Sequence, residues 1–237
     1  LIRLNVDKVS SDLQKSLGAE IKKLLSPLGK VEIRRVDIVG AKVGNELKEK
    51  GLEALTFAII GILIYVAFRF EWRFAVASVL ALMHDTIISL GAVSAFNIEV
   101  NLDVLAAILT LMGYSLNDTI VVFDRIREEV RETKIKDLAT LINIAISKTL
   151  SRTVLTSLTT FFVVFTLFLF GGEIIKPFSF TLLVGIIVGT YSSIFIASPL
   201  LIWLGFKIDD YRKRLAEKER IKKEKEKMRQ IYQGGVV

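Results

Sequence analysis

The chain has 237 residues, of which 52% are hydrophobic and 24% charged, with a net charge of +7 and a mean hydropathy of +0.51. This mixture requires the apolar residues to lie in separate blocks, as is typical of a membrane protein. The absence of cysteine excludes disulfides and thiolate metal sites, and the one histidine, His84, cannot form a histidine-based metal site alone. We therefore expect no metal and no cofactor.

The first 50 residues predict a partial, small α/β domain outside the membrane. Residues 1–6 and 31–39 alternate as strands do, and residues 10–25 have the spacing of a helix. Two strands and one helix make a poor core, and the chain opens with Leu1 in a strand-like run. We therefore expect that the natural N-terminus lies further upstream.

Five apolar runs are long enough to cross a bilayer, which requires about 20 apolar residues for each crossing. They cover residues 52–70, 74–96, 104–123, 153–170 and 178–204. We predict an α-helical membrane bundle over 51–205, in which segment 124–152 lies outside the bilayer.

The last of these runs carries two signals about its packing. Pro199 removes one backbone hydrogen bond and is expected to bend the helix near its end. Small or hydroxyl-bearing residues recur there at intervals of four: Thr181, Gly185, Gly189 and Ser193. Because small residues at this spacing let two helix backbones approach closely, we expect a packing seam rather than a transport path.

The distribution of Lys and Arg predicts which ends of the spans are cytoplasmic. Segment 124–152 carries seven basic residues and the tail 206–237 carries eleven. The connections 97–103 and 171–177 carry none and one. We therefore place the two basic segments, including the C-terminus, in the cytoplasm and residues 1–50 outside.

Residues 206–237 form a charged tail in which basic and acidic residues alternate. Opposite charges three or four residues apart are typical of a solvated helix. A basic residue near anionic lipid headgroups gains about 1 kcal/mol. We therefore expect the tail to lie near the lipid bilayer and do not expect it to bind nucleic acid.

Asp118 is the leading candidate for function because it is an ionisable group inside the apolar run 104–123. A charge at the centre of a membrane helix costs about 3 kcal/mol on insertion scales, so such a group needs a partner or a function. Ser115 lies on the same helical face as Asp118, and Asn117 adjoins that face.

Two other runs carry polar residues at helical spacing. Arg152, Thr156, Thr159 and Thr160 form one polar stripe, and Asp85 with Ser89 forms another, beside His84. Lipid does not satisfy such faces, so we expect the three polar faces to point toward one another. His84 and Asp85 are either members of a proton relay or a satisfied polar pair, and the sequence leaves both readings open.

Arg152 is the natural partner for Asp118. Asp118 lies roughly 7 Å from the cytoplasmic end of its helix at 1.5 Å per residue, and Arg152 begins the next span from the same side. A helix movement that joins or separates the two groups would change the proton affinity of Asp118. The alternative is that Arg152 only anchors its helix in the headgroup region.

Several motifs resemble those of the SecF family, the smaller subunit of the bacterial SecDF protein-export complex within the resistance-nodulation-division superfamily. The most distinctive is the run GYSLNDTIVVFDRIRE at 113–128. The other similar motifs are VGAKVG at 39–44, FRFEWRF at 68–74, HD at 84–85 and SRTVLTS at 151–157.

The resemblance implies six membrane helices with a ferredoxin-like outer domain between the first two, so that five helices and part of the domain are expected here. It implies a non-enzymatic subunit of the bacterial inner membrane that uses proton flow to move unfolded polypeptides outward. The partners it implies are SecD, the SecYEG channel and the accessory proteins YajC and YidC. By motif position, Asp118 and Arg152 match the proton pathway of the family. The further candidate members of that pathway are Asp85, His84, Asn117, Ser115 and Thr156.

Two other functions share part of this chemistry. A small-molecule exporter of the same superfamily would also use protons, but about 50 outer residues leave no room for a drug-binding domain. An intramembrane aspartyl protease could use Asp85 and Asp118 as a pair of carboxylates. Asp118, however, follows Tyr-Ser-Leu-Asn rather than the glycine-rich sequence expected of such a protease.

Overall fold

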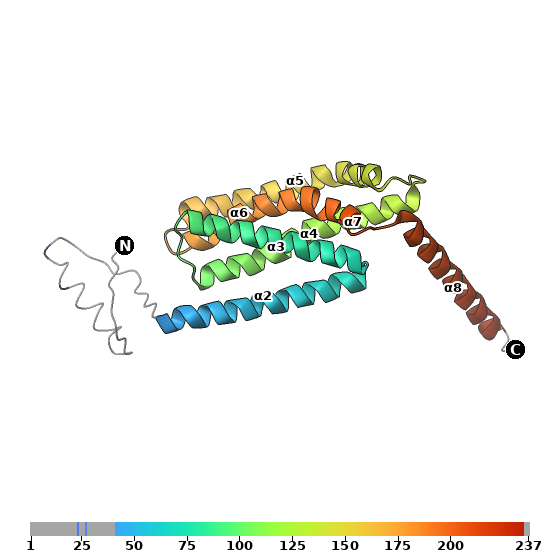
Figure 1. Ribbon diagram of the computed structural model, residues 1–237, viewed down its shortest axis with the longest axis horizontal. Coiled ribbons are helices and arrows are strands. Elements are labelled where there is room, and N and C mark those ends of the chain that lie inside the picture. Colours follow the sequence, from blue (N-terminus) through green and yellow to red (C-terminus); the bar gives the residue numbers. More distant parts are fainter. Residues whose placement is uncertain (1–22, 24–26, 28–40, 235–237) are drawn as a thin grey trace. The chain divides into compact units, whose positions relative to one another are not determined.

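The computed structural model describes residues 23, 27 and 41–234. The chain divides into two compact units, 1–53 and 54–237. No strand occurs among the described residues, whose long elements are all helical (Figure 1). The α/β piece predicted for residues 1–50 lies mostly outside this range, and from Ala41 onward the predicted domain is helix instead.

Five of the described helices are long and apolar enough to cross a membrane, which confirms the number of spans predicted from the sequence. The fifth crossing is composite, because a π-helix joins two α-helices within it. The elements in chain order are α2 (Ala41–Arg69), α3 (Trp72–Ala95), α4 (Leu102–Glu132), α5 (Leu138–Phe170), α6 (Lys176–Ser192), the π-helix η2 (Ser193–Ala197), α7 (Ser198–Trp203) and α8 (Ile208–Gly234).

Helices α4 and α5 are much longer than the apolar runs that predicted them. The segment 124–152, predicted to lie outside the bilayer, is mostly a continuation of these two helices, joined by residues 133–137. Asp137 caps α5 by accepting hydrogen bonds from the amide and the hydroxyl of Thr140, at 2.8 and 2.6 Å. These bonds hold the pKa of Asp137 below its usual value. A charged segment can thus remain helical because its end is capped and its inner face is apolar.

Helix α6 packs against three other helices of the bundle, α3, α4 and α5 (Figure 1). Its small residues allow this close approach. A Cβ atom added at Gly185 would lie 2.5 Å from the Leu111 side chain of α4, and one at Gly189 would lie 3.0 Å from Cβ of Ser115. The two helices can therefore meet at this depth only because these positions lack side chains.

The surface of the bundle is strongly apolar. Phe68, Phe170 and Trp203 are each more than 80% exposed, whereas Asp85 and Asp118 are almost completely buried. Water-soluble proteins bury apolar side chains and expose charged ones. The opposite arrangement seen here is stable where hydrocarbon surrounds the protein.

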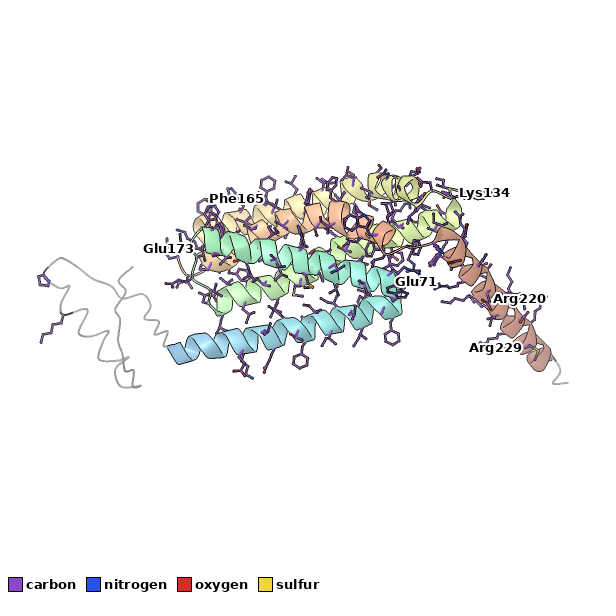
Figure 2. All side chains as sticks on the ribbon, in the orientation of Figure 1. Glu71, Lys134, Phe165, Glu173, Arg220 and Arg229 are labelled. Atoms are coloured by element: carbon purple, nitrogen blue, oxygen red, sulfur yellow. The ribbon has the colours of Figure 1, made fainter. Side chains whose placement is uncertain are left out.

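One end of the bundle, which we call the basic end, is where α4 finishes and α3, α5 and α8 begin. Figure 2 labels Glu71 and Lys134 at this end, and Phe165 and Glu173 near the opposite end. Aromatic rings close the basic end, with Phe74 5.0 Å from Phe123 and 5.1 Å from Phe206 between ring centroids.

The last crossing is interrupted where the sequence predicts a disturbance. Regular α-helix ends at Ser192, and the π-helix runs from Ser193 to Ala197, just before Pro199. Proline lacks an N–H group and its ring clashes with the carbonyl four residues earlier, so a wider turn relieves the clash. The hydroxyl of Ser198 donates to the carbonyl of Ser193 at 3.1 Å, so this carbonyl of the wide turn has a hydrogen-bond partner.

Helix α8 is attached to the basic end through its first turns. The Arg212 guanidinium donates to the carbonyls of Val130, Thr133 and Ile135, which follow the end of α4 or lie in its last turn. Further along, α8 is exposed and carries ion pairs between residues four apart, such as Arg220 with Glu224 at 3.3 Å.

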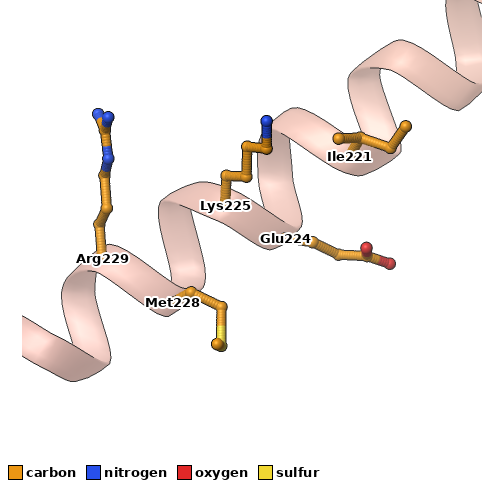
Figure 3. Close-up of a pocket in the computed structure, with 5 residues that line it drawn as sticks. All are labelled: Ile221, Glu224, Lys225, Met228 and Arg229. Carbon is orange, nitrogen blue, oxygen red and sulfur yellow. The ribbon is translucent and has the colours of Figure 1, made fainter.

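A shallow depression on α8 is lined by Ile221, Glu224, Lys225, Met228 and Arg229 (Figure 3). All five side chains come from one helix, and Figure 3 shows that they spread away from it rather than enclose a space. The depression is therefore a feature of the helix surface and not a binding site.

Candidate functional site

Asp118 lies on α4 inside the bundle and is 2% exposed. Its Oδ2 atom accepts a hydrogen bond of 3.1 Å from the hydroxyl of Ser157 on α5. The hydroxyl of Thr190 on α6 lies 2.7 Å from the Ser157 oxygen. A chain of two hydroxyls therefore connects α6 to the carboxylate of α4 through α5.

Asp85 lies on α3 and is 1% exposed. Its Oδ2 atom accepts hydrogen bonds from Ser115 of α4 at 2.6 Å and from Ser192 of α6 at 2.9 Å. Its Oδ1 atom lies 3.0 Å from Nδ1 of the partly buried His84. Side chains from three helices thus meet at this carboxylate.

The two carboxylates differ in how well they are satisfied. Among the described residues, Asp118 has Ser157 as its one hydrogen-bond partner, whereas Asp85 has three. Buried polar groups are normally fully hydrogen-bonded, because an unsatisfied one costs about 1–3 kcal/mol. Fewer hydrogen bonds therefore stabilise the ionised carboxylate at Asp118 than at Asp85.

Three predicted site residues lie on the exposed surface of the described bundle: Asn117, Arg152 and Thr156. The expected ion pair between Asp118 and Arg152 does not form in this structure, in which Arg152 is exposed and Asp118 is bonded to Ser157. The hydroxyl of Thr156 bonds instead to the carbonyls of Arg152 and Thr153, within its own helix.

Arg152, Thr156 and Thr159 are exposed in this structure and Thr160 is half-buried, so the predicted stripe does not face the interior of the described bundle. The buried polar stripe of α5 is Thr149, Thr153 and Ser157, which lies about one residue away around the helix. Residues four apart share a face, so both sets fit the helical period equally well. The threonines of the outer stripe are tolerated there because their hydroxyls bond to carbonyls of their own helix.

Sequence reasoning also missed Ser157, Thr190 and Ser192, which supply hydroxyl partners around the two carboxylates. Ser157 ends the SRTVLTS motif, so its position could have been found there. Thr190 and Ser192 belong to the run TYSS at 190–193 inside the apolar span, but serine and threonine hydroxyls can bond to carbonyls of their own helix, so the run alone did not assign them to the site.

The described residues contain no group of three or more acidic or histidine side chains placed to hold a metal ion. Asp85 and Asp118 are not hydrogen-bonded to each other, since each carboxylate is engaged by different hydroxyls. Two carboxylates sharing a proton are what an aspartyl protease requires, so the described geometry does not favour that alternative.

Comparisons with known proteins agree on one family. Residues 20–207 match the family model of the C-terminal part of the protein export membrane proteins SecD and SecF. The protein translocase subunit SecF of Helicobacter pylori (strain J99) is 54% identical over 221 residues, which are 93% of this chain and 68% of that protein. The SecF subunit of Pseudomonas aeruginosa is 48% identical over 178 residues, which are 75% of this chain and 58% of that protein.

Solved structures show the same relationship. The crystal structure of SecDF from Thermus thermophilus, a translocon-associated membrane protein, matches with a TM-score of 0.74 and 40% identity. The match covers 83% of this chain but 27% of that one, so the chain spans about a quarter of the solved protein. A second SecDF crystal structure, in a form described as super-membrane-facing, matches with a TM-score of 0.64 and 36% identity over 90% of this chain and 28% of that one.

A bundle of apolar helices around buried carboxylates, matched to this family over most of its length, defines a polytopic membrane protein of the export machinery. The chain belongs to the SecD/SecF family of protein export membrane proteins. Within that family its relatives are SecF, a translocase subunit rather than an enzyme. The relatives do not support the exporter or protease alternatives.

Proposed function

We propose that this chain assists protein export as a proton-coupled subunit and that Asp118 is the group that takes up and releases the proton. The observation that carries the proposal is the burial of Asp118 to 2% exposure, with one hydroxyl as its partner among the described residues. A buried carboxylate with so few hydrogen bonds gains or loses a proton readily when its surroundings change.

Arg152 is the proposed partner that changes those surroundings. In the described state it is exposed and forms no ion pair with Asp118. A movement of α5 relative to α4 that brings the guanidinium closer favours the ionised carboxylate, and the reverse movement favours the neutral acid. Each proton that crosses supplies about 2.3 kcal/mol per 100 mV of membrane potential to drive such movements.

SecD is the proposed partner. The matched solved structures are of SecDF, in which the two subunits occur together. Asn117 and Thr156 lie next to the buried site residues but are exposed on α4 and α5. Polar groups at membrane depth are more stable against another protein than against lipid, which supports a partner helix on this surface.

The remaining partners follow from the family. We propose that the complex works beside the SecYEG channel and the accessory proteins YajC and YidC, with an unfolded polypeptide in transit as its substrate. The proposed location is the inner membrane of a bacterium, with the basic end in the cytoplasm and residues 1–50 outside.

Replacement of Asp118 by Asn tests the proposal. Asparagine has nearly the same size and still accepts a hydrogen bond from Ser157, but it cannot take up a proton at neutral pH. We expect D118N to insert normally, to bind SecD, and to lose stimulation of export by a proton gradient. The measurement is transport of a preprotein into inverted membrane vesicles with and without the gradient.

Thr166 offers a control, because T166A changes an exposed residue of α5 whose hydroxyl donates to the carbonyl of Phe162 within its own helix. We expect T166A to retain proton-dependent export above half of the parental level. Undiminished proton stimulation in D118N vesicles would show that Asp118 carries no essential proton and would overturn the proposal.

A further inference from the structure

Asp85 lies where three helices converge at the beginning of the π-helix. Its Oδ2 atom takes hydrogen bonds from Ser115 of α4 and from Ser192, the last residue of α6. The next residue, Ser193, begins the π-helix. The carboxylate therefore fixes α6 at the point where its geometry changes.

The same stretch of α6 also serves Asp118. Thr190 lies two residues before Ser192, and its hydroxyl contacts Ser157, the partner of Asp118. Because Thr190 and Ser192 lie within one turn of a single helix, the position that Asp85 gives to Ser192 also determines the position of Thr190.

Gly189 makes this arrangement possible. A Cβ atom at this position would lie 3.2 Å from the Ser115 hydroxyl and 3.6 Å from Oδ2 of Asp85. With no side chain at Gly189, α6 lies close enough for Ser192 to reach the carboxylate. The contact thus depends on a close approach of helix backbones and not on the reach of long side chains.

We propose that Asp85 is a positioning residue that carries no proton itself: it anchors Ser192 at the beginning of the π-helix and so holds Thr190 and Ser157 against Asp118. Asp85 is already engaged by three partners, whereas Asp118 has one among the described residues. The inference rests on the proposed proton uptake at Asp118 and assigns the second buried carboxylate a different role.

Replacement by asparagine separates positioning from proton transfer. In Asp85→Asn the side-chain amide oxygen could accept both serine hydroxyls, and the NH₂ group could donate to Nδ1 of His84, so this variant preserves all three contacts. Asp85→Ala removes them all. A positioning residue is rescued by the conservative variant, and a proton carrier is not.

The experiment compares proton-driven export by the complete complex in inverted vesicles for Asp85→Asn, Asp85→Ala and Asp118→Asn. We expect Asp85→Asn to retain about half of the parental rate or more and the parental dependence on pH, because its hydrogen bonds persist. Asp85→Ala should fall about tenfold or further, since misplacement of a reactive group by about 1 Å can have effects of that size.

The outcomes for the two aspartates are separable. If Asp85→Asn loses proton stimulation as completely as Asp118→Asn, Asp85 carries a proton and the positioning role is rejected, while proton uptake at Asp118 stands. If Asp118→Asn keeps its stimulation, the proposed function fails, whatever the Asp85 variants do. If Asp85→Asn and Asp85→Ala both behave like the parent, neither role of Asp85 survives.

Ser192→Ala provides a milder second variant in case Asp85→Ala does not fold. It keeps the carboxylate and removes one hydrogen bond, so we expect export to slow about threefold to tenfold. Ser89→Ala is the matched control, because Ser89 is equally buried one turn away on α3 and its hydroxyl has no partner among the described residues. Equal rates for Ser192→Ala and Ser89→Ala would contradict the anchoring role.

A structural measurement tests the same point without transport. The chain has no cysteine, so the pair Ser157→Cys and Thr190→Cys reports directly on the contact between α5 and α6. We expect oxidative cross-linking of this pair to slow about threefold or more when Ser192→Ala is added. It should not change when Ser89→Ala is added. Unchanged cross-linking with Ser192→Ala would overturn the proposal.

Discussion

At the scale of single residues, two buried aspartates in one bundle have different surroundings. Asp85 takes hydrogen bonds from residues of three helices, and Asp118 from Ser157 of α5. The sequence identified both residues, because a carboxylate inside an apolar run stands out. It could not assign their partners, since hydroxyl groups on neighbouring helices become partners only through packing.

Gly185 allows a prediction about packing. A Cβ atom there would lie within 3 Å of three atoms of the Leu111 side chain. We expect G185A to destabilise the bundle by about 1–3 kcal/mol, because Leu111 must leave its preferred conformation. The unfolding midpoint in detergent micelles measures the effect.

Gly91 is the control for this substitution, because it lies in α3 and a Cβ atom there meets nothing within 4 Å. Alanine is favoured over glycine in a helix by about 1 kcal/mol, so G91A should be neutral or slightly stabilising. Equal midpoints for G185A and G91A would show that α6 and α4 are not in close contact at Gly185.

At the scale of helices, hydropathy predicted the five crossings but not the full length of two of them. The prediction placed one run at 104–123, but α4 continues to Glu132, because Ile126 and Val130 keep an apolar face among charged residues. Hydropathy averaged along the sequence detects the apolar part of a helix. It does not detect the part of the same helix that continues beyond the membrane with charged residues on its outer face. On α5 the period allowed two polar stripes, and only packing decides between them.

Arg212 is expected to hold α8 against the end of α4. Its guanidinium donates to three backbone carbonyls, including those of Val130 and Ile135 at 2.9 and 3.0 Å. Lysine cannot reproduce this planar geometry, so R212K should fail to replace it. We expect amide hydrogen exchange over 208–216 to quicken about tenfold in R212K, since charge-assisted bonds contribute about 1.5–3 kcal/mol.

The appropriate comparison for R212K is K213A, which alters the next residue, an exposed lysine. Exchange over the same amides should remain at the parental rate in K213A. If R212K also exchanged at that rate, the three carbonyl contacts would not be what attaches α8.

At the scale of the whole molecule, the absence of native cysteine makes the proposed orientation directly testable. Lys134 lies exposed at the basic end and Glu173 near the opposite end (Figure 2). In intact cells a membrane-impermeant maleimide should label E173C and not K134C, and in inverted vesicles the pattern should reverse. Labelling of K134C in intact cells would mean that the positive-inside rule fails for this chain.

The length of α4 beyond its buried carboxylate has a mechanical consequence. The helix runs 14 residues from Asp118 to Glu132, roughly 21 Å at 1.5 Å per residue. Over such an arm, a tilt of about 5° at the carboxylate displaces the far tip by about 2 Å, more than the change in a single hydrogen bond. If Asp118 takes up the proton as proposed, its gain or loss would be amplified at the tip of α4, where the carbonyls held by Arg212 would transmit the motion to α8.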